Sequence, residues 1–298
     1  MFLTIDQQYN LVEKKLATKK INTELNLVTF KYAKKVMYDY MWDGNPDLLE
    51  CRGHTYCLET GDQIVFPPSK SFNYLENDTW KDKPLSTEVT LYKKYNGFMA
   101  CVSVHHGKVI ISTTGSTSGP YVGMAKELIF KRFPLESIAK TWGKDKSEGS
   151  WLFEICHKND PHIVHEVEGA YYLGYRHYNE EFLPCTDVIG QMPVDCTLGY
   201  ALDLINVIKH EGFMMYDNET DEVCKLKSPY YVGKKKLMRM TDSRIEQMFA
   251  NPNKYVKENL PKSWDWWSDT VKDCLTESTW KSYTEQERRH FIEEIENA

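Results

Sequence analysis

The string Lys94-Tyr95-Asn96-Gly97 lies within residues 87–113, whose pattern predicts a meander of strands. Residues 87–91 lead in, residues 98–104 form the next strand, and residues 109–113 return after a turn at residues 105–108. Because Asn-Gly is a common turn sequence, the string taken alone describes a surface turn preceded by a lysine just as well. Its meaning depends on what surrounds it.

Strand and helix patterns alternate on both sides of this segment, which favours an α+β fold. Further short strands are expected over residues 49–63, 151–156, 170–175, 212–215 and 223–226. Helices are expected over residues 121–141 and 197–209, and helix or mixed structure over residues 6–20 and 28–41.

The strand signals stop after Lys236, and residues 241–298 predict helices interrupted at Pro252 and Pro261. We therefore expect a sheet-rich catalytic domain, residues 1–233, followed by a small helical domain, residues 234–298. Trp264, Trp266 and Trp267 offer rings for stacking on bases, although packing between helices is the commoner use of such side chains.

The chain has 298 residues, of which 41% are hydrophobic and 27% charged, a normal globular balance. A net charge of −6 argues against a protein that coats nucleic acid, since phosphate contacts need local Lys and Arg. No Cys-x-x-Cys pair suggests zinc. We see no signal peptide and no apolar run of the ~20 residues that a membrane span needs, so we expect a cytoplasmic protein with reduced thiols and no membrane partner.

Five further motifs stand in a fixed order around Lys94. They are Glu50-Cys51-Arg52-Gly53, the run from Phe66-Pro67-Pro68-Ser69-Lys70 to Ser71-Phe72-Asn73, Phe153-Glu154, Glu211-Gly212-Phe213 and Lys225-Leu226-Lys227-Ser228. Lys225 and Lys227 alternate along a strand, so both project to one face. That face either meets Lys94 or is an exposed edge that deters aggregation. By the same alternation, Glu154 points either to solvent or into a site.

In this order the motifs resemble the covalent nucleotidyltransferase superfamily of ligases and capping enzymes. More narrowly, Glu-Cys-Arg-Gly followed by Lys-x-Phe-Asn resembles the bacteriophage tRNA-repair RNA ligase 1 family, over about residues 28–232. The resemblance implies an adenylyltransferase domain with antiparallel sheets flanked by helices. It also implies that the C-terminal helical domain selects the RNA.

The resemblance implies a role for each motif residue. Lys94 would be the nucleophile that becomes lysyl-AMP, and Gly97 and Tyr231 would contact the substrate or the transition state. The ATP-binding residues would be Tyr32, Arg52, Lys70, Glu154, Lys225 and Lys227. Glu211 would bind the metal, Mg²⁺ or Mn²⁺, and Asp242 a second one. For Tyr32 and Tyr231, packing in the core is an alternative.

The chemistry demands this set of residues. Attack on the α-phosphate needs an unprotonated amine, whereas a solvated lysine has a pKa of ~10.4. Neighbouring cations such as Lys225 and Lys227 lower that pKa, and they also hold phosphate. Negative charge spreads over the phosphoryl oxygens in the transition state, so cations must already be in place. Arg52 suits bidentate phosphate binding.

The sequence departs from the family at three points. Asn96 stands where phage members commonly have Asp, Thr114 stands where a lysine often precedes Gly-Ser, and only 71 residues follow Lys227. We expect a monomeric RNA ligase that joins 5′-phosphate and 3′-hydroxyl ends, including those of nicked tRNA, in the host cytoplasm if the protein is viral. The alternatives are a DNA ligase or capping enzyme, although no OB-fold is recognisable after residue 233, and a non-catalytic RNA-end binding protein.

Overall fold

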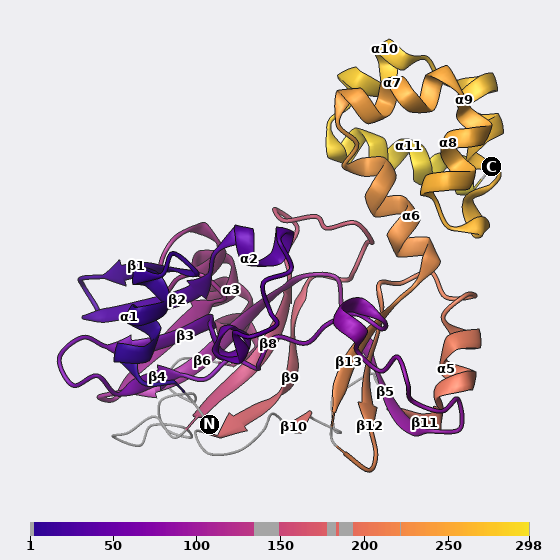
Figure 1. Cartoon of the computed structure of the whole chain (residues 1–298). Helices are drawn as coiled ribbons and strands as arrows, with labels where there is room; N and C mark the ends of the chain where they lie inside the picture. Colours follow the sequence, from indigo (N-terminus) through magenta and orange to yellow (C-terminus); the bar gives the residue numbers. More distant parts are fainter. Residues whose placement is uncertain (1–2, 134–148, 178–182, 185–192, 221, 298) are drawn as a thin grey trace. The chain divides into compact units, whose positions relative to one another are not determined.

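The computed structural model describes residues 3–133, 149–177, 183–184, 193–220 and 222–297. The chain divides into two compact units, and neither is a single stretch of sequence. The first unit comprises Met1–Phe72, Gly97–Asp160 and Val167–Met192, and the second comprises Asn73–Asn96, Pro161–Glu166 and Pro193–Ala298. Figure 1 traces the chain through both units.

The first unit contains two antiparallel sheets. One has the strand order β1 (Ala17–Asn22), β2 (Leu27–Tyr32), β3 (Arg52–Cys57), β4 (Gln63–Val65). The other has the order β10 (Leu183–Pro184), β9 (Gly169–His177), β8 (Gly149–Cys156), β6 (Phe98–His105), β7 (Lys108–Thr113). β2, β3 and β6 are largely buried, whereas β1 is mostly exposed.

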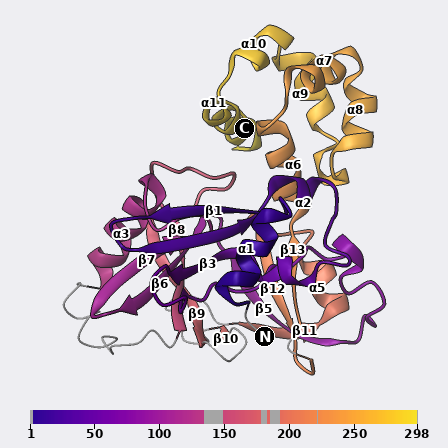
Figure 2. The ribbon, with the colours of Figure 1, turned by 60° about the vertical axis from the view of Figure 1, so that its left-hand side comes forward.

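Apolar clusters define the layers of this unit. Leu27 and Val65 of the first sheet pack against Met99 and Leu152 of the second, so the two sheets lie face to face. The outer face of the first sheet is covered by α1 (Ile5–Glu13), with α2 (Lys34–Tyr38) and a 3₁₀ turn at Pro46–Glu50 nearby. The outer face of the second is covered by α3 (Pro120–Arg132), as Figure 2 shows.

The second unit contains one antiparallel sheet in the order β11 (Val194–Thr197), β5 (Glu88–Lys94), β12 (Gly212–Asp217), β13 (Val223–Lys227). One face packs on α5 (Leu198–Leu204) through residues such as Leu91, Met215 and Leu226. Side chains that alternate with these, among them Lys94, project from the other face. Another 3₁₀ turn, Glu76–Asp78, precedes β5.

Helices form the rest of this unit. They are α6 (Pro229–Met238), α7 (Asp242–Ala250), α8 (Pro252–Asn259), the 3₁₀ turn Lys262–Trp264, α9 (Trp267–Cys274), α10 (Glu277–Ser282) and α11 (Glu285–Asn297). Their apolar faces share one cluster around Trp264, Trp267 and Trp280, which are almost completely buried. No helix in the described ranges combines the length and apolarity of a membrane span.

The α+β fold class is confirmed, with antiparallel sheets, flanking helices and a helical C-terminal region. The hairpin over residues 98–113, the pair β12–β13 and the helix breaks at Pro252 and Pro261 are found as predicted. The division at residue 233 stays a prediction, supported by the separate apolar cluster of the C-terminal helices.

Two local expectations were wrong. β5 does not continue into the β6–β7 meander; it pairs with β11 and β12, because its apolar face completes the cluster around α5. The expectation of helix or mixed structure over residues 6–20 and 28–41 was met as mixed structure, since these residues contain α1 and α2 as well as β1 and β2. The helix expected over residues 197–209 ends at Leu204. Residues 134–141 of the helix expected over 121–141 lie outside the described residues.

Candidate active site

Lys94, Gly212 and Lys227 form one row across the sheet of the second unit. Gly212 on β12 lies directly opposite Lys94 on β5 and opposite Lys227 on β13. Cross-strand partners share a face, and residues two apart along a strand share it too. Lys225, opposite Met214, therefore lies on the same face as Lys94 and Lys227. The register thus brings three of the predicted lysines onto one surface.

The carboxylate of Glu211 is the point on which these side chains converge. Glu211 is 3% exposed, and its Oε1 lies 3.1 Å from Nζ of Lys94 and 3.7 Å from Nζ of Lys227. Its Oε2 accepts a hydrogen bond of 2.8 Å from Nδ2 of Asn96. A buried carboxylate in contact with two ammonium groups and an amide fixes their positions.

Asn96 has a second partner that explains its amide. Its Oδ1 accepts a 2.8 Å hydrogen bond from the backbone N–H of Val164. The side chain is buried, with a donor facing Glu211 and an acceptor facing Val164. Aspartate could accept from Val164 but would confront Glu211 with a second negative charge. The hydrogen bonds to Glu211 and Val164 thus give a physical reason for an amide at position 96.

The lysines around Glu211 lie in a partly desolvated environment. Burial lowers the pKa of Lys227; Glu211 opposes this shift, and the charges of Lys235 and Lys94 add to it. Burial likewise lowers the pKa of Lys235, with Arg239 and Lys94 contributing. Such a concentration of positive charge stabilises an anionic ligand and is costly to the protein in the absence of one.

Gly212 is required by close packing. Its φ is +140°, and a Cβ atom built there would overlap the carbonyl oxygen of Leu226. Its N–H donates to Nδ1 of His210, 3.2 Å away, and burial lowers the pKa of His210, which keeps that nitrogen an acceptor. The hydroxyl of Ser228 donates to the carbonyl of His210 at 2.6 Å. These contacts fix the backbone on either side of Glu211.

Tyr231 and Asp242 occupy different environments. Tyr231 is buried in the first turn of α6, and Nζ of Lys227 lies 5.2 Å from the centre of its ring. It therefore belongs both to the core and to the surroundings of the lysines. Asp242 is an exposed residue at the start of α7, and the interaction that the structure gives it is with Arg288.

In the first unit, Arg52 begins β3 directly opposite Lys31 of β2. Burial lowers the pKa of Lys31, and the charges of Arg52 and Lys34 add to this. After Arg52, Gly53 has a φ of +100°, and a Cβ there would lie 2.8 Å from Cα of Thr114. The Glu-Cys-Arg-Gly motif thus places a cation beside other cations and leaves room for the loop that carries Thr114.

Glu50 ties this motif to the segment that carries Lys70. Burial opposes its ionisation, but hydrogen bonds from His54 and Ser69 and the charge of Arg176 outweigh burial and hold its pKa at about 2. Burial lowers the pKa of His54, whose Nε2 lies 3.2 Å from Oε2 of Glu50. Arg176 also donates to the carbonyl of Pro67.

Lys70 and Tyr32 meet around Trp42. The Lys70 ammonium lies 4.0 Å from the centre of the Phe72 ring and 5.4 Å from that of Trp42, and it donates to the carbonyl of Ser71. Tyr32 packs edge-on against Trp42 with ring centres 5.0 Å apart. This aromatic group positions the ammonium of Lys70 by cation–π contacts.

Glu154 accepts a hydrogen bond from the Lys94–Gly97 segment. Its Oε1 accepts a 3.1 Å hydrogen bond from the backbone N–H of Gly97. A Cβ at Gly97 would overlap the carbonyl oxygen of Ile155, so only glycine fits against β8. Glu154 lies on the face opposite to the one that α3 covers, since its neighbours Phe153 and Ile155 belong to the α3 cluster.

The side chains around Glu211 fit a magnesium or manganese ion whose coordination is completed mainly by phosphates and waters. Glu211 offers one buried carboxylate, and Mg²⁺ typically takes one or two such groups plus phosphates and waters. In the described ranges no group of three or more His, Cys, Asp or Glu side chains is placed to hold a metal by itself.

Comparison with known proteins identifies the fold. No protein-family model matches the sequence, and no curated protein matches it. A solved structure described as "Archaeal ATP-dependent RNA ligase - form 1" matches with a TM-score of 0.52 at 14% identity, over 95% of this chain and 77% of that chain. A putative ATP-dependent DNA ligase from Aquifex aeolicus matches with a TM-score of 0.51 at 13% identity, over 98% and 78%. The chain therefore shares the fold of these two solved structures.

The sequence analysis missed the residues that hold the site together. Glu50, His54 and Arg176 form one network, His210 and Ser228 another, and Asn96 links two segments. Glu50 and Ser228 could have been found from the sequence, since both lie within the motifs described above, but those motifs did not indicate what they contact. Arg176 carried none, because it lies 126 residues from Glu50 in the chain.

Proposed function

We propose that this protein is an ATP-dependent RNA ligase whose nucleophile is Lys94. The observation that carries the proposal is the convergence of Lys94 and Lys227 on the buried carboxylate of Glu211. The proposal is supported by the meeting of an amine, a second cation and a buried acid in one partly desolvated cluster. Such a cluster suits nucleotidyl transfer better than a surface turn or an edge lysine.

The reaction proceeds in three transfers. Nζ of Lys94 forms a bond to the α-phosphorus of ATP while the bond to pyrophosphate breaks. An RNA 5′-phosphate oxygen then attacks the same phosphorus and releases Lys94, which leaves the adenylate on the RNA. Finally, an RNA 3′-hydroxyl attacks the 5′-phosphorus, loses its proton and expels AMP, which creates the phosphodiester.

The predicted residues divide by the step that they serve. Lys225, Lys227, Arg52 and Lys70 neutralise phosphate charge, and Tyr32 and Glu154 contact the nucleotide. Gly97 and Tyr231 contact the substrate in the transition state. Glu211 would hold the Mg²⁺ or Mn²⁺ ion, which would neutralise charge on the phosphate oxygens. Asp242 would serve a second ion.

RNA is preferred over DNA on the resemblance of the motifs to the phage tRNA-repair ligases, and the archaeal RNA ligase supports the same fold. The likeness to a putative DNA ligase is the observation that favours the rival. We propose a monomer that acts in the cytoplasm on RNA ends, nicked tRNA among them, and whose helical C-terminal region selects the substrate.

Labelled nucleotides and matched strands test the proposal. The protein is incubated with α-labelled ATP or GTP, and then with nicked RNA or DNA carrying a 5′-phosphate. We expect label transfer to protein from ATP alone and joining of RNA. Label from GTP would indicate a capping enzyme, and joining of DNA alone would indicate a DNA ligase.

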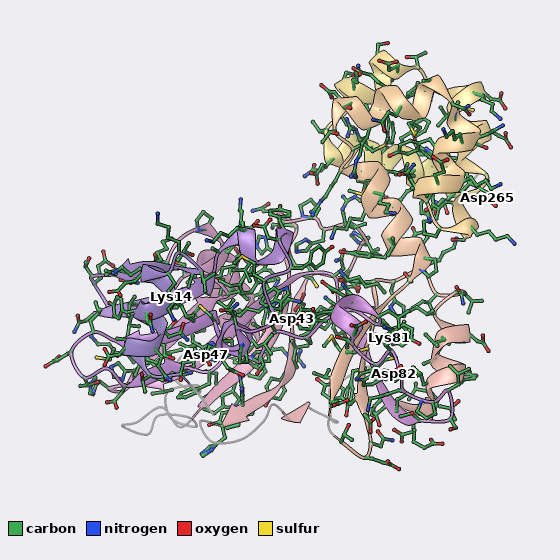
Figure 3. The ribbon with its side chains drawn as sticks, in the orientation of Figure 1. Lys14, Asp43, Asp47, Lys81, Asp82 and Asp265 are labelled. Carbon is green, nitrogen blue, oxygen red and sulfur yellow. The ribbon has the colours of Figure 1, made fainter. Side chains whose placement is uncertain are left out.

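The non-catalytic alternative makes a different prediction. A protein that only binds RNA ends would retain RNA without acquiring label from either nucleotide. Lys81 provides a control for non-specific charge effects, because it is an exposed lysine on the segment before β5, labelled in Figure 3. Lys94→Ala should abolish label transfer, and Lys81→Ala should leave it unchanged.

A further inference from the structure

A pocket of about 360 Å³ opens within the second unit, and its lining residues include neither Lys94 nor Glu211. It is lined by the segment that follows α5, by the start of α6, by the turn before α9 and by the end of α11. Val207 and Lys209 stand at its exposed rim, and Val207 is 77% exposed. The volume falls within the range of small-ligand sites.

The wall of this pocket is a set of nearly parallel aromatic rings. Trp264 packs against Trp266 with ring centres 5.4 Å apart and an interplanar angle of 24°. It packs against Tyr230 with centres 5.9 Å apart and an angle of 25°. Trp264 is almost fully buried and fixed by a hydrogen bond to the carbonyl of Pro229, whereas Trp266 stays partly exposed. The arrangement presents a rigid ring to a flat ligand.

Polar groups flank the rings on two sides. Glu296 accepts a 2.9 Å hydrogen bond from the hydroxyl of Tyr230, and its carboxylate lines the pocket. A carboxylate of this kind accepts hydrogen bonds from base N–H groups, as it does from the amino group of cytosine. Lys209 at the rim supplies a cation for a phosphate.

The charge of the helical region disfavours binding through phosphates alone. Residues 241–298 contain twelve Asp and Glu and eight Lys and Arg, a net charge of −4. Such a surface repels the backbone of a nucleic acid, which favours a contact made through a base. Asp265, next to Trp266 and labelled in Figure 3, is one of these exposed acids.

We propose that this pocket binds one unpaired nucleobase of the RNA substrate, stacked on Trp266 and hydrogen-bonded to Glu296. The inference rests on the proposed function, because it takes the substrate to be RNA. It assigns the helical region a base-reading subsite that is separate from the chemistry at Lys94. Stacking tolerates every base, and Glu296 favours those that offer an amino group.

The test is the binding of labelled single-stranded oligoribonucleotides, followed by fluorescence anisotropy. Trp266→Ala should weaken binding about tenfold or more, and Trp266→Phe should stay within about threefold of wild type. Tyr200→Ala is the matched control, since Tyr200 is an aromatic residue of α5 that is 56% exposed and outside the pocket lining. It should bind as wild type does.

Two further arms keep the outcome decisive. Val207→Glu adds a negative charge at the rim without touching the core, and it should weaken binding even if Trp266→Ala unfolds. A strand with abasic sites lacks the base that would stack on Trp266. Its affinity for wild type and for Trp266→Phe should therefore be no higher than the affinity of the normal strand for Trp266→Ala.

Equal binding by wild type, Trp266→Ala and Val207→Glu would overturn the proposal. So would a dimer of the wild type that Trp266→Ala dissociates, because a second copy would then fill the pocket. Label transfer from ATP to Lys94 should persist in all these variants. If the wild-type protein acquires no label from ATP, the ligase proposal is overturned, whatever the RNA binding shows.

Discussion

The Nζ atom of Lys94 lies 3.1 Å from the Oε1 atom of Glu211, and the two are joined in the sheet through Gly212. The nucleophile that we propose is thus held by an ion pair. Attack on a phosphorus atom requires that this pair open, and an incoming anionic nucleotide gives Lys227 and Lys94 another partner. The contacts around Glu211 therefore determine how easily the amine of Lys94 is released from the ion pair for attack.

Asn96→Asp should slow adenylate formation by at least about tenfold. The substitution removes the hydrogen bond to Glu211 and places two carboxylates within about 3 Å of each other. Single-turnover label transfer from ATP measures the effect, with Asn253→Asp on the exposed side of α8 as the control. A rate equal to or above that of wild type would contradict this account of Asn96.

Gly212→Ala should lower the free energy of unfolding by more than about 2 kcal/mol. The added Cβ would overlap the carbonyl of Leu226 at a φ of +140°. Gly123→Ala, on helix α3, is the matched change, because no atom lies within 4 Å of its Cβ position. It should raise stability by about 0.5–1 kcal/mol. Denaturant titration compares the two variants, and a neutral Gly212→Ala would refute the packing argument.

Glu50 should make the protein sensitive to acid. Its pKa in the folded state is about 2, below the ordinary value of 4.5, so its contribution to stability is complete above pH 4.5 and disappears as the pH falls towards 2. The shift corresponds to at most about 3 kcal/mol. Glu50→Gln should be less stable than wild type at pH 7, and the difference should shrink on acidification. A difference independent of pH would assign Glu50 a purely steric role.

Lys227→Ala should reduce adenylate formation by about a hundredfold or more, chiefly through loss of charge stabilisation of the leaving pyrophosphate. Lys81→Ala removes an exposed lysine and should have no effect. Because burial lowers the pKa of Lys227, the rate in wild type should fall on the alkaline side at a pH below 10.5. A flat alkaline limb would argue against a charged Lys227 in the reaction.

The sequence was informative where a short-range period decides the structure. The two-residue spacing of Lys225 and Lys227 predicted a shared face, and the turn at residues 105–108 predicted the β6–β7 hairpin. These features depend on neighbours in the chain, so the pattern contains them.

The pairing of strands that are far apart in the chain could not be predicted from the sequence. The pairing of β5 with β12 joins residues more than a hundred positions apart, although β6 is the next strand in the chain. The apolar side chains of β5 that pack in the cluster with α5 favour this pairing. Likewise, Asn96 is explained by Val164, 68 residues away. Such partners cannot be chosen from local propensity, because the free energy that selects them comes from packing.

The most direct test of the central claim is the intact mass of the protein after incubation with ATP and Mg²⁺, followed by mapping of the modified peptide. We predict a gain of one AMP on Lys94, absent in Lys94→Ala and present in Lys81→Ala. An unchanged mass in folded wild-type protein, or an AMP on another residue, would contradict the account.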